Sequence, residues 1–374
     1  MNPFLSSGYA GEEYFCGRRT ESDKILNAIE NQKNIAIYSV KGMGRSSLIN
    51  HVIHQLGASG KYHTLHLDIS RSQTIEDLIN IIGTAILSNY DQLPAVSRTK
   101  AESFIERAKP VVSYDPLTDQ TSYAFYLDRP GEISWTLQEL FAIINETGRE
   151  ARLVIAIDEL TRILEYSDSL SSEALIRHIN ALDHVRFIFS GSKQQLFSAL
   201  FADVPHPLIN NTNTIVLREI PASTYSKFIS SWFNKLNIDH TPDAIPLILD
   251  WTRRHTFYTQ YVCRTIVANR TDYLDHDSLM WIFHQVLLEK EPHYLAYGKM
   301  LTRLQWKLLV ALALEDGIAR ITTVRFMKKH GLSNASTVRR GVVALLDKGL
   351  IKRDKGRYFV DDLFFAHWLR WRQG

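Results

Sequence analysis

The pattern of apolar and polar positions predicts alternating strands and helices over the first 220 residues. Short apolar runs rich in β-branched and aromatic residues occupy 34–38, 63–69, 153–157, 186–190 and 213–217. Between most of these runs the apolar residues recur at helical spacing, as in 20–32, where Thr20 is the expected N-cap, and in 46–56. Strands separated by helices predict an α/β fold with a mainly parallel sheet and helices on both faces.

Two other patterns follow this segment. From about Ile220 to Pro292 the strand pattern disappears and helical spacing dominates, which predicts an all-α lid. The last part has short helices and then two short strands around a basic turn at 349–360, the order of a winged helix-turn-helix. The expected domains are therefore a core at 1–219, a helical lid at 220–295 and a winged-helix domain at 296–374.

Residues 96–132 do not fit this scheme. They are polar and irregular and contain Pro110, Pro116 and Pro130. We interpret them as a helix followed by a long surface loop, and the sequence does not indicate a function for them.

Composition narrows the class of protein. The chain has 374 residues, more than one ordinary core, and no stretch approaches the roughly 18 apolar residues that span a bilayer. The N-terminus lacks a basic start followed by an apolar run, so we expect a cytoplasmic protein without a secretory signal and without a membrane role. Cys16 and Cys263 lie far apart, with no ligands at zinc spacing, and are expected to be reduced thiols.

A glycine loop follows the first predicted strand and precedes a helix. The segment Ser39–Ser46 reads S-V-K-G-M-G-R-S. In such loops backbone N–H groups turn onto phosphate oxygens, a cation contacts the terminal phosphates, and a hydroxyl binds Mg²⁺. The loop departs from G-x-x-x-x-G-K-[ST] at Ser39 and at Arg45, which replaces the lysine. Alone, it is equally consistent with a phosphate site and a plain turn.

An acidic pair strengthens the phosphate interpretation. Asp158 and Glu159 end the most apolar strand, Leu153–Ile157. In P-loop NTPases an aspartate at this place holds Mg²⁺, and a neighbouring glutamate polarises the attacking water. An ordinary strand that ends in a helix N-cap remains the alternative. The loop and the acidic pair together are more specific than either one alone.

Several motifs give the chain a resemblance to a known family. They are Gly8-Tyr9, the Y-F-C-G-R run Tyr14–Arg18, the loop read as S-x-x-x-M-G-x-[ST], the acidic pair, and Phe189–Ser192 after the fourth strand. Over nearly its full length the chain resembles the archaeal-type ATPases of the STAND clade of AAA+ P-loop NTPases. Membership implies ATP or ADP with Mg²⁺ held between core and lid. It also implies a nucleotide-controlled switch rather than a metabolic kinase.

The resemblance assigns roles to individual residues. Nucleotide binding is assigned to Lys41, Gly42, Met43, Gly44, Arg45, Ser46 and Ser47. Tyr14, Phe15 and Arg18 would line the pocket for the purine base, and His255 would contact the nucleotide from the lid. The lid segment Arg254–Tyr258 keeps the His of the family's Gly-His-Pro but neither its Gly nor its Pro. Mg²⁺ would be held by Ser46 and Asp158, and the catalytic set would be Glu159, Arg45 and Ser192.

One of these roles has an alternative, and one residue of the family is missing. Ser192 or Ser190 would sense the γ-phosphate, and a simple turn hydroxyl is the other interpretation. Relatives place Arg-Pro where this chain has His206-Pro207, so one candidate for stabilising transition-state charge in a neighbouring subunit is missing.

Arg45 limits the expected chemistry. A guanidinium is wider than an ammonium, planar and differently directed, so it does not replace the P-loop lysine conservatively. ATP binding is expected to survive, because positive charge is retained and backbone donors do most of the holding. Hydrolysis is expected to be weak or absent.

Positive charge is concentrated near the C-terminus. The whole chain has a net charge of only +3, yet residues 325–357 hold ten Lys or Arg against two acids. A helix capped by Ser333 or Asn334 would expose Arg339 and Arg340, and the wing would carry Lys352, Arg353, Lys355 and Arg357. This set is compatible with DNA contact, but an intramolecular clamp or a protein-docking surface is the favoured interpretation. The rival to an ATP switch is thus a non-hydrolysing DNA-binding regulator or scaffold, and an oligomer is possible in either case.

Overall fold

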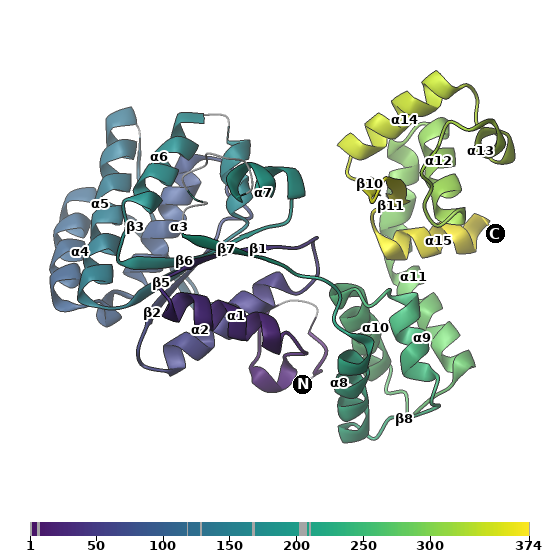
Figure 1. The fold of residues 1–374 in the computed structure, drawn as a ribbon, viewed down its shortest axis with the longest axis horizontal. Coiled ribbons are helices and arrows are strands. Elements are labelled where there is room, and N and C mark those ends of the chain that lie inside the picture. The colour runs from purple at the N-terminus through teal and green to yellow at the C-terminus, as the bar shows by residue number, and fades with distance from the viewer. Residues whose placement is uncertain are drawn as a thin grey trace. The chain divides into compact units, whose positions relative to one another are not determined.

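The predicted parallel sheet is present in the computed structural model of the chain (Figure 1). Its strands are β1 (Asn34–Tyr38), β2 (His63–Asp68), β5 (Leu153–Asp158), β6 (Val185–Gly191) and β7 (Thr212–Val216). Their order in the sheet is β2-β5-β6-β1-β7, and each neighbouring pair is parallel. Every residue of β5 is buried, as expected for a central strand covered on both faces.

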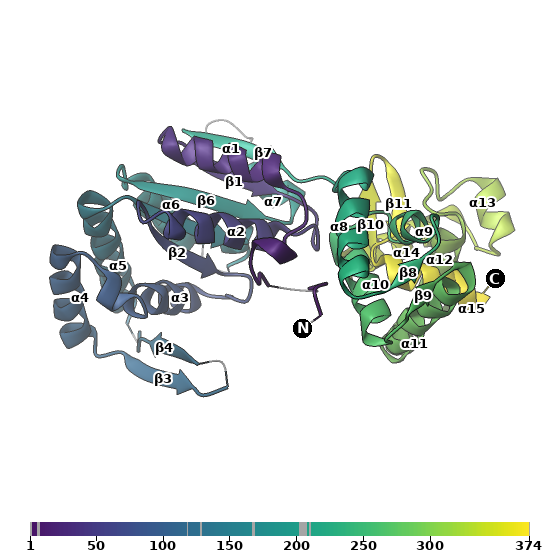
Figure 2. The ribbon, with the colours of Figure 1, turned by 90° about the horizontal axis from the view of Figure 1, so that it is seen from below.

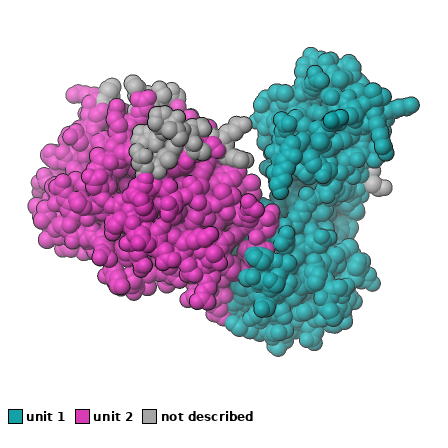
Figure 3. Space-filling view, in the orientation of Figure 1, with its two compact units in different colours: residues 1–6, 221–374 teal, residues 7–220 magenta. Residues whose placement is uncertain are grey.

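The structure describes residues 2–5, 8–117, 119–127, 129–166, 169–201, 208 and 211–373. They divide into two units, coloured separately in Figure 3. We call Ser7–Ile220 the first unit (unit 2 in Figure 3, magenta) and Met1–Ser6 with Pro221–Gly374 the second unit (unit 1 in Figure 3, teal).

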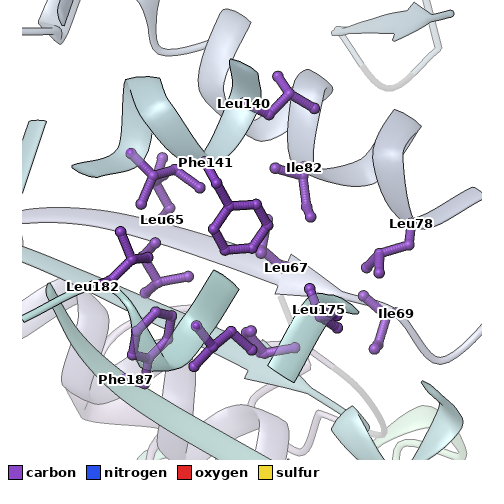
Figure 4. Packing of buried hydrophobic residues seen from close by; sticks show 14 of the residues in the cluster. Leu65, Leu67, Ile69, Leu78, Ile82, Leu140, Phe141, Leu175, Leu182 and Phe187 are labelled. Carbon is purple, nitrogen blue, oxygen red and sulfur yellow. The ribbon is translucent and has the colours of Figure 1, made fainter. Parts of the chain in front are cut away.

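Helices cover both faces of the sheet in the first unit. They are α1 (Arg19–Glu30), α2 (Arg45–Ala58), α3 (Ile75–Leu87), α4 (Ala95–Ala108), α5 (Pro130–Glu150), α6 (Ser169–Asn180) and α7 (Gln194–Phe201), with the 3-10 turns η1 (Glu12–Tyr14), η2 (Tyr90–Gln92) and η3 (Leu160–Glu165). On one face Ile25 and Val52 pack with Val154. On the other, Ile82 and Phe141 join the larger cluster shown in Figure 4.

The start of α1 differs from the expectation. Thr20 is not its N-cap; Arg18 is, in the left-handed region at φ 62° and without a side-chain cap. The Arg18 side chain instead donates to Glu21 Oε1 and to the Met43 carbonyl, both at 3.0 Å. This side chain therefore links the start of the helix to the glycine loop.

The segment at 96–132 contains a β-hairpin that the sequence pattern did not predict. Strands β3 (Val111–Asp115) and β4 (Gln120–Ala124) pair antiparallel, and the expected helix before them is α4. Figure 2 shows the hairpin extending from the α3–α4 side of the unit, away from the sheet. Side chains of α3 hold it: Thr84 Oγ1 accepts from Tyr123 N at 2.9 Å, and Asn80 Oδ1 accepts from Phe125 N at 2.9 Å.

The second unit contains the expected lid and winged helix. The lid has α8 (Ala222–Lys235), α9 (Ala244–Trp251), α10 (Thr256–Ala268), α11 (His276–Met300) and the two-residue strands β8 (Asp239–His240) and β9 (Tyr273–Leu274). The winged helix has α12 (Arg303–Leu314), α13 (Val324–Lys329), α14 (Ala335–Asp347), β10 (Ile351–Asp354), β11 (Arg357–Val360) and α15 (Leu363–Gln373). The N-terminal Phe4 is buried here, at 6.1 Å from the ring of Phe228 and 5.9 Å from that of Phe233.

Aromatic packing joins the lid to the winged helix. The Trp251 ring stacks on Phe283 at 4.1 Å and on His367 at 4.5 Å between centroids. Asp362 immediately precedes α15 and accepts hydrogen bonds from Tyr258 and Tyr294, at 3.3 and 3.4 Å. These contacts explain why lid and winged helix form one unit.

His367 makes this junction sensitive to acid. Burial lowers the pKa of His367 from 6.5 to about 4, although its hydrogen bond to the Trp251 carbonyl acts the other way. The unfolded chain therefore binds a proton between about pH 6.5 and 4 that the folded unit does not bind. The free energy of unfolding should fall as pH drops through this window, by up to about 1.4 kcal/mol per pH unit, and stay flat below it.

Unfolding of the full chain followed against pH tests this prediction. A His367→Gln variant, which keeps a donor for the Trp251 carbonyl, should lose that part of the slope. The matched control is His276→Gln, because the side chain of His276 is 64% exposed. An unchanged slope in His367→Gln would show that this imidazole is not held neutral.

Candidate functional site

The glycine loop lies between β1 and α2, as predicted. Gly42 and Gly44 adopt φ of 80° and 86°, the left-handed region that a β-carbon disfavours. Gly44 is the N-cap of α2, and the N–H groups in the first turn of any helix lack intrahelical partners. Lys41 and Ser46 are exposed on the loop. Loop and helix terminus together offer the N–H donors and the charge that bind phosphate.

Arg45 points inward from the start of α2. Its side chain is only 8% exposed. Nε donates to Asp158 Oδ1 at 3.2 Å, Nη1 to the Ser39 carbonyl at 3.2 Å, and Nη2 forms an ion pair with Glu159 Oε1. The guanidinium thus joins the ends of β1 and β5.

The acidic pair is satisfied at each of its four oxygens. Asp158 Oδ1 accepts from Arg45, from Ser190 Oγ and from Glu159 N, and Oδ2 accepts from Ser46 Oγ. Glu159 Oε1 pairs with Arg45, and Oε2 accepts from Ser192 N and Oγ at 3.1 and 3.0 Å. Burial alone would raise the pKa of Asp158. The charge of Arg45 and the hydrogen bonds from Ser190, Ser46 and Arg45 outweigh burial and hold that pKa below its usual value.

The sheet explains why these residues meet. β5, β6 and β1 are consecutive parallel neighbours, so their carboxyl ends lie at one edge. This edge brings together the predicted Arg45, Ser46, Asp158, Glu159 and Ser192. It also holds two buried hydroxyl residues: Ser190, the predicted alternative to Ser192, and Ser39, which the sequence pattern noted only as a departure from the loop motif.

Residues assigned to the base lie beside the loop and α2. Arg18 binds the Met43 carbonyl, and Phe15 stacks on the His51 ring at 4.1 Å between centroids. Tyr9 Oη and His51 Nδ1 are 2.9 Å apart, and Ser47 Oγ donates to the Gly8 carbonyl at 2.9 Å. Sequence reasoning missed His51, although its spacing of four from Ser47 places both on one face of the helix. Tyr14 ends η1 nearby in the chain.

Other predicted residues lie outside this cluster. His255 is the N-cap of α10 in the second unit, with its ring 4.6 Å from that of Tyr258. His206-Pro207 fall outside the described residues. In the winged helix, Asn334 rather than Ser333 caps α14, by accepting from Thr337 N at 2.9 Å.

The basic set of the winged helix is exposed. Its members are Arg339, Arg340, Lys352, Arg353, Lys355 and Arg357. Two of them also bind within the unit, because Lys352 pairs with Asp361 at 3.2 Å and Arg357 donates to the Gly317 carbonyl at 2.6 Å. The exposed heads form a positive surface on this domain.

The chain is similar to one known domain family and to several solved structures. Residues 292–371 match the family described as a probable winged helix domain. The Walker-type ATPase PABY2304 of Pyrococcus abyssi aligns over 98% of this chain and 99% of its own, with a TM-score of 0.66 and 17% identity. The Aeropyrum pernix ORC2 protein, solved as ADPNP–ADP complexes, aligns over 100% and 98%, with a TM-score of 0.59 and 10% identity. No curated protein sequence matches this chain.

The chain has an AAA+-like P-loop fold. At these identities the likeness establishes the architecture: a parallel α/β sheet with helices, a helical lid and a C-terminal winged helix. The Aeropyrum pernix ORC1 protein, solved in complex with DNA, is also similar, with a TM-score of 0.53 and 13% identity over 96% of this chain and 93% of its own. Within the described ranges, none of the helices has the length and apolar character needed to cross a membrane.

The AAA+ fold implies a magnesium ion with the nucleotide, and the donor set fits one. Ser46 Oγ, in the first turn of α2, donates a hydrogen bond to Asp158 Oδ2, and both atoms are the hard oxygen ligands that Mg²⁺ prefers. In the part of the chain that the structure describes, no three His, Cys, Asp or Glu side chains are grouped to hold a metal by themselves. Phosphate oxygens and water would therefore complete the coordination of a bound Mg²⁺.

Proposed function

We propose that the chain is an ATP-binding molecular switch of the STAND type with weak or absent hydrolysis. The observation that carries this proposal is the glycine loop joined to the acidic pair through Arg45 and Ser46 in one hydrogen-bonded cluster. The similarity to a protein solved with ADPNP and ADP supports a nucleotide as the ligand.

Each residue of the site has a distinct role in this proposal. Backbone N–H groups from Gly42 to Ser46 hold the phosphates at the N-terminus of α2. Mg²⁺, when bound, neutralises phosphate charge, and Ser46 and Asp158 would hold it. Glu159 is the group for positioning water, and Ser192 holds its carboxylate in place.

Weak hydrolysis follows from the same contacts. Glu159 Oε1 is paired with Arg45 and its Oε2 with Ser192, so neither oxygen is free to orient water in this arrangement. The guanidinium also lies among carboxylates rather than beside the exposed part of the loop. Both features favour binding over turnover.

Calorimetry with ATP and ADP, together with phosphate release from the same sample, tests the proposal. Micromolar binding is expected, with turnover near background and abolished in Glu159→Gln. Gly44→Val should weaken binding at least tenfold, because valine is strained at φ 86° and crowds the phosphate path. The matched control is Gly60→Val, at φ 66° in an exposed turn distant in sequence from the loop, with open space at its β-carbon. Absence of binding by the wild-type chain would overturn the proposal.

A second candidate is a DNA-binding regulator or scaffold that acts through the winged helix. The exposed basic set and the similarity to a protein solved with DNA favour it. Salt-dependent DNA binding without nucleotide, combined with no nucleotide binding, would select this candidate over the switch.

A further inference from the structure

We propose that Arg45 is the fixed counter-ion of the Asp158–Glu159 pair, so that nucleotide binds equally well with and without Mg²⁺ and Lys41 supplies the cation for its phosphates. This inference rests on the proposed function and specifies which nucleotide species the site accepts.

The first argument is the direction of the guanidinium. Each of its three nitrogens donates to the protein: Nε to Asp158, Nη1 to Ser39 and Nη2 to Glu159. A planar fork can reach both carboxylates at once, whereas one ammonium is a point charge. Arg45 therefore neutralises the acidic pair and is turned away from the exposed part of the loop.

The second argument concerns what a metal would displace. The four oxygens of the acidic pair already accept hydrogen bonds within the protein. Moving Arg45 aside would leave a buried guanidinium without its partners, which is strongly unfavourable. If Arg45 stays, its charge repels a divalent ion at Asp158, and Mg²⁺ gives up its water shell reluctantly. Only the contact of Asp158 Oδ2 with Ser46 Oγ could then open for a metal, at reduced affinity.

The third argument is the source of positive charge for the phosphates. Lys41 is exposed on the loop, immediately before the two glycines that turn its backbone. A compact ammonium on a flexible stem suits a phosphate group whose position the backbone N–H donors fix. In this altered loop Arg45 neutralises the acidic pair and Lys41 neutralises the phosphates. In other P-loops the lysine and Mg²⁺ share these two roles.

Calorimetric titration of the full chain with ADP and with ATP, in EDTA and in millimolar Mg²⁺, tests the inference. For the wild type, the dissociation constants in the two buffers should agree within about threefold. Lys41→Ala should weaken binding about tenfold in both buffers. Arg45→Lys should make binding at least tenfold tighter with Mg²⁺ than without, because one ammonium cannot hold both carboxylates. Melting curves would show which variants are folded.

The outcomes separate this inference from the proposed function. Binding that appears only with Mg²⁺ in the wild type would overturn the inference and leave the switch proposal intact. No binding in either buffer would remove both. Manganese titration of the nucleotide-free chain, followed by electron paramagnetic resonance, gives a second measurement that needs no variant. Free Mn²⁺ throughout is expected, and a stoichiometric bound ion would contradict Arg45 as the fixed counter-ion.

Discussion

An Arg45→Lys variant is expected to hydrolyse ATP about a hundredfold faster than the wild-type chain. A lysine at this place can reach between the terminal phosphates, and one well-placed charge interaction contributes about 3 kcal/mol to the transition state, which corresponds to that factor. The change would also release Glu159 from its ion pair and let it orient water. Phosphate release at saturating ATP and Mg²⁺ measures the effect.

The control for this gain is the double variant Arg45→Lys with Glu159→Gln. It keeps the new ammonium and removes the carboxylate, so its turnover should fall to background, as in Glu159→Gln alone. If Arg45→Lys alone brings no gain, another part of the machinery, such as the lid segment at His255 or the segment at His206, must also lack a catalytic group.

Removing the charge of Arg45 altogether should destabilise the first unit by about 3–5 kcal/mol, because the buried Asp158 and the partly buried Glu159 would lose their counter-ion. Arg45→Met tests this with a side chain of similar length. Hydrogen exchange at the amides of β5 reports the local free energy of opening next to Asp158. Addition of Glu159→Gln should restore part of the loss, since one of the two uncompensated charges disappears.

The exposed ion pair between Arg107 and Glu139 provides the comparison. Its nitrogen and oxygen lie 2.8 Å apart, but the two side chains are 50% and 29% exposed. Arg107→Met should therefore cost at most about 1 kcal/mol. Equal losses in Arg45→Met and Arg107→Met would mean that burial does not give the Arg45 cluster its special weight.

The sequence predicted the central strands of the sheet well because they are buried. Central parallel strands are covered on both faces, so they appear as continuous apolar runs such as Leu153–Ile157. The acidic pair could be assigned to the loop for a related reason, since carboxyl ends of parallel strands meet at one edge. Helix and strand existence in the core thus followed from local pattern.

The hairpin could not be predicted in the same way. Every residue of β3 is exposed, so no apolar alternation marks it as a strand. Its partner β4 is positioned by hydrogen bonds to Asn80 and Thr84, which lie about 40 residues earlier in the chain. A strand held by such distant side chains leaves little local signal.

The direction of Arg45 was also beyond sequence reasoning. The motif placed its charge at phosphate, and that role stays a prediction. In the structure the guanidinium reaches an aspartate 113 residues away, and this depends on how β1 and β5 are spaced in the sheet. The start of α1 was missed similarly, because the contact of Arg18 with Met43 is tertiary.

The buried N-terminal residues bear on how this chain can be divided for study. Phe4 is 1% exposed and packs against Phe228 and Phe233, although most of the chain between them belongs to the other unit. A fragment that begins at Pro221 would lack the Phe4 ring and would expose the rings of Phe228 and Phe233 to solvent, which favours aggregation. Residues 2–5, supplied as a fused leader or as a separate peptide, would cover these rings again. Isolated expression of the lid and winged helix therefore depends on a piece of sequence more than 200 positions upstream.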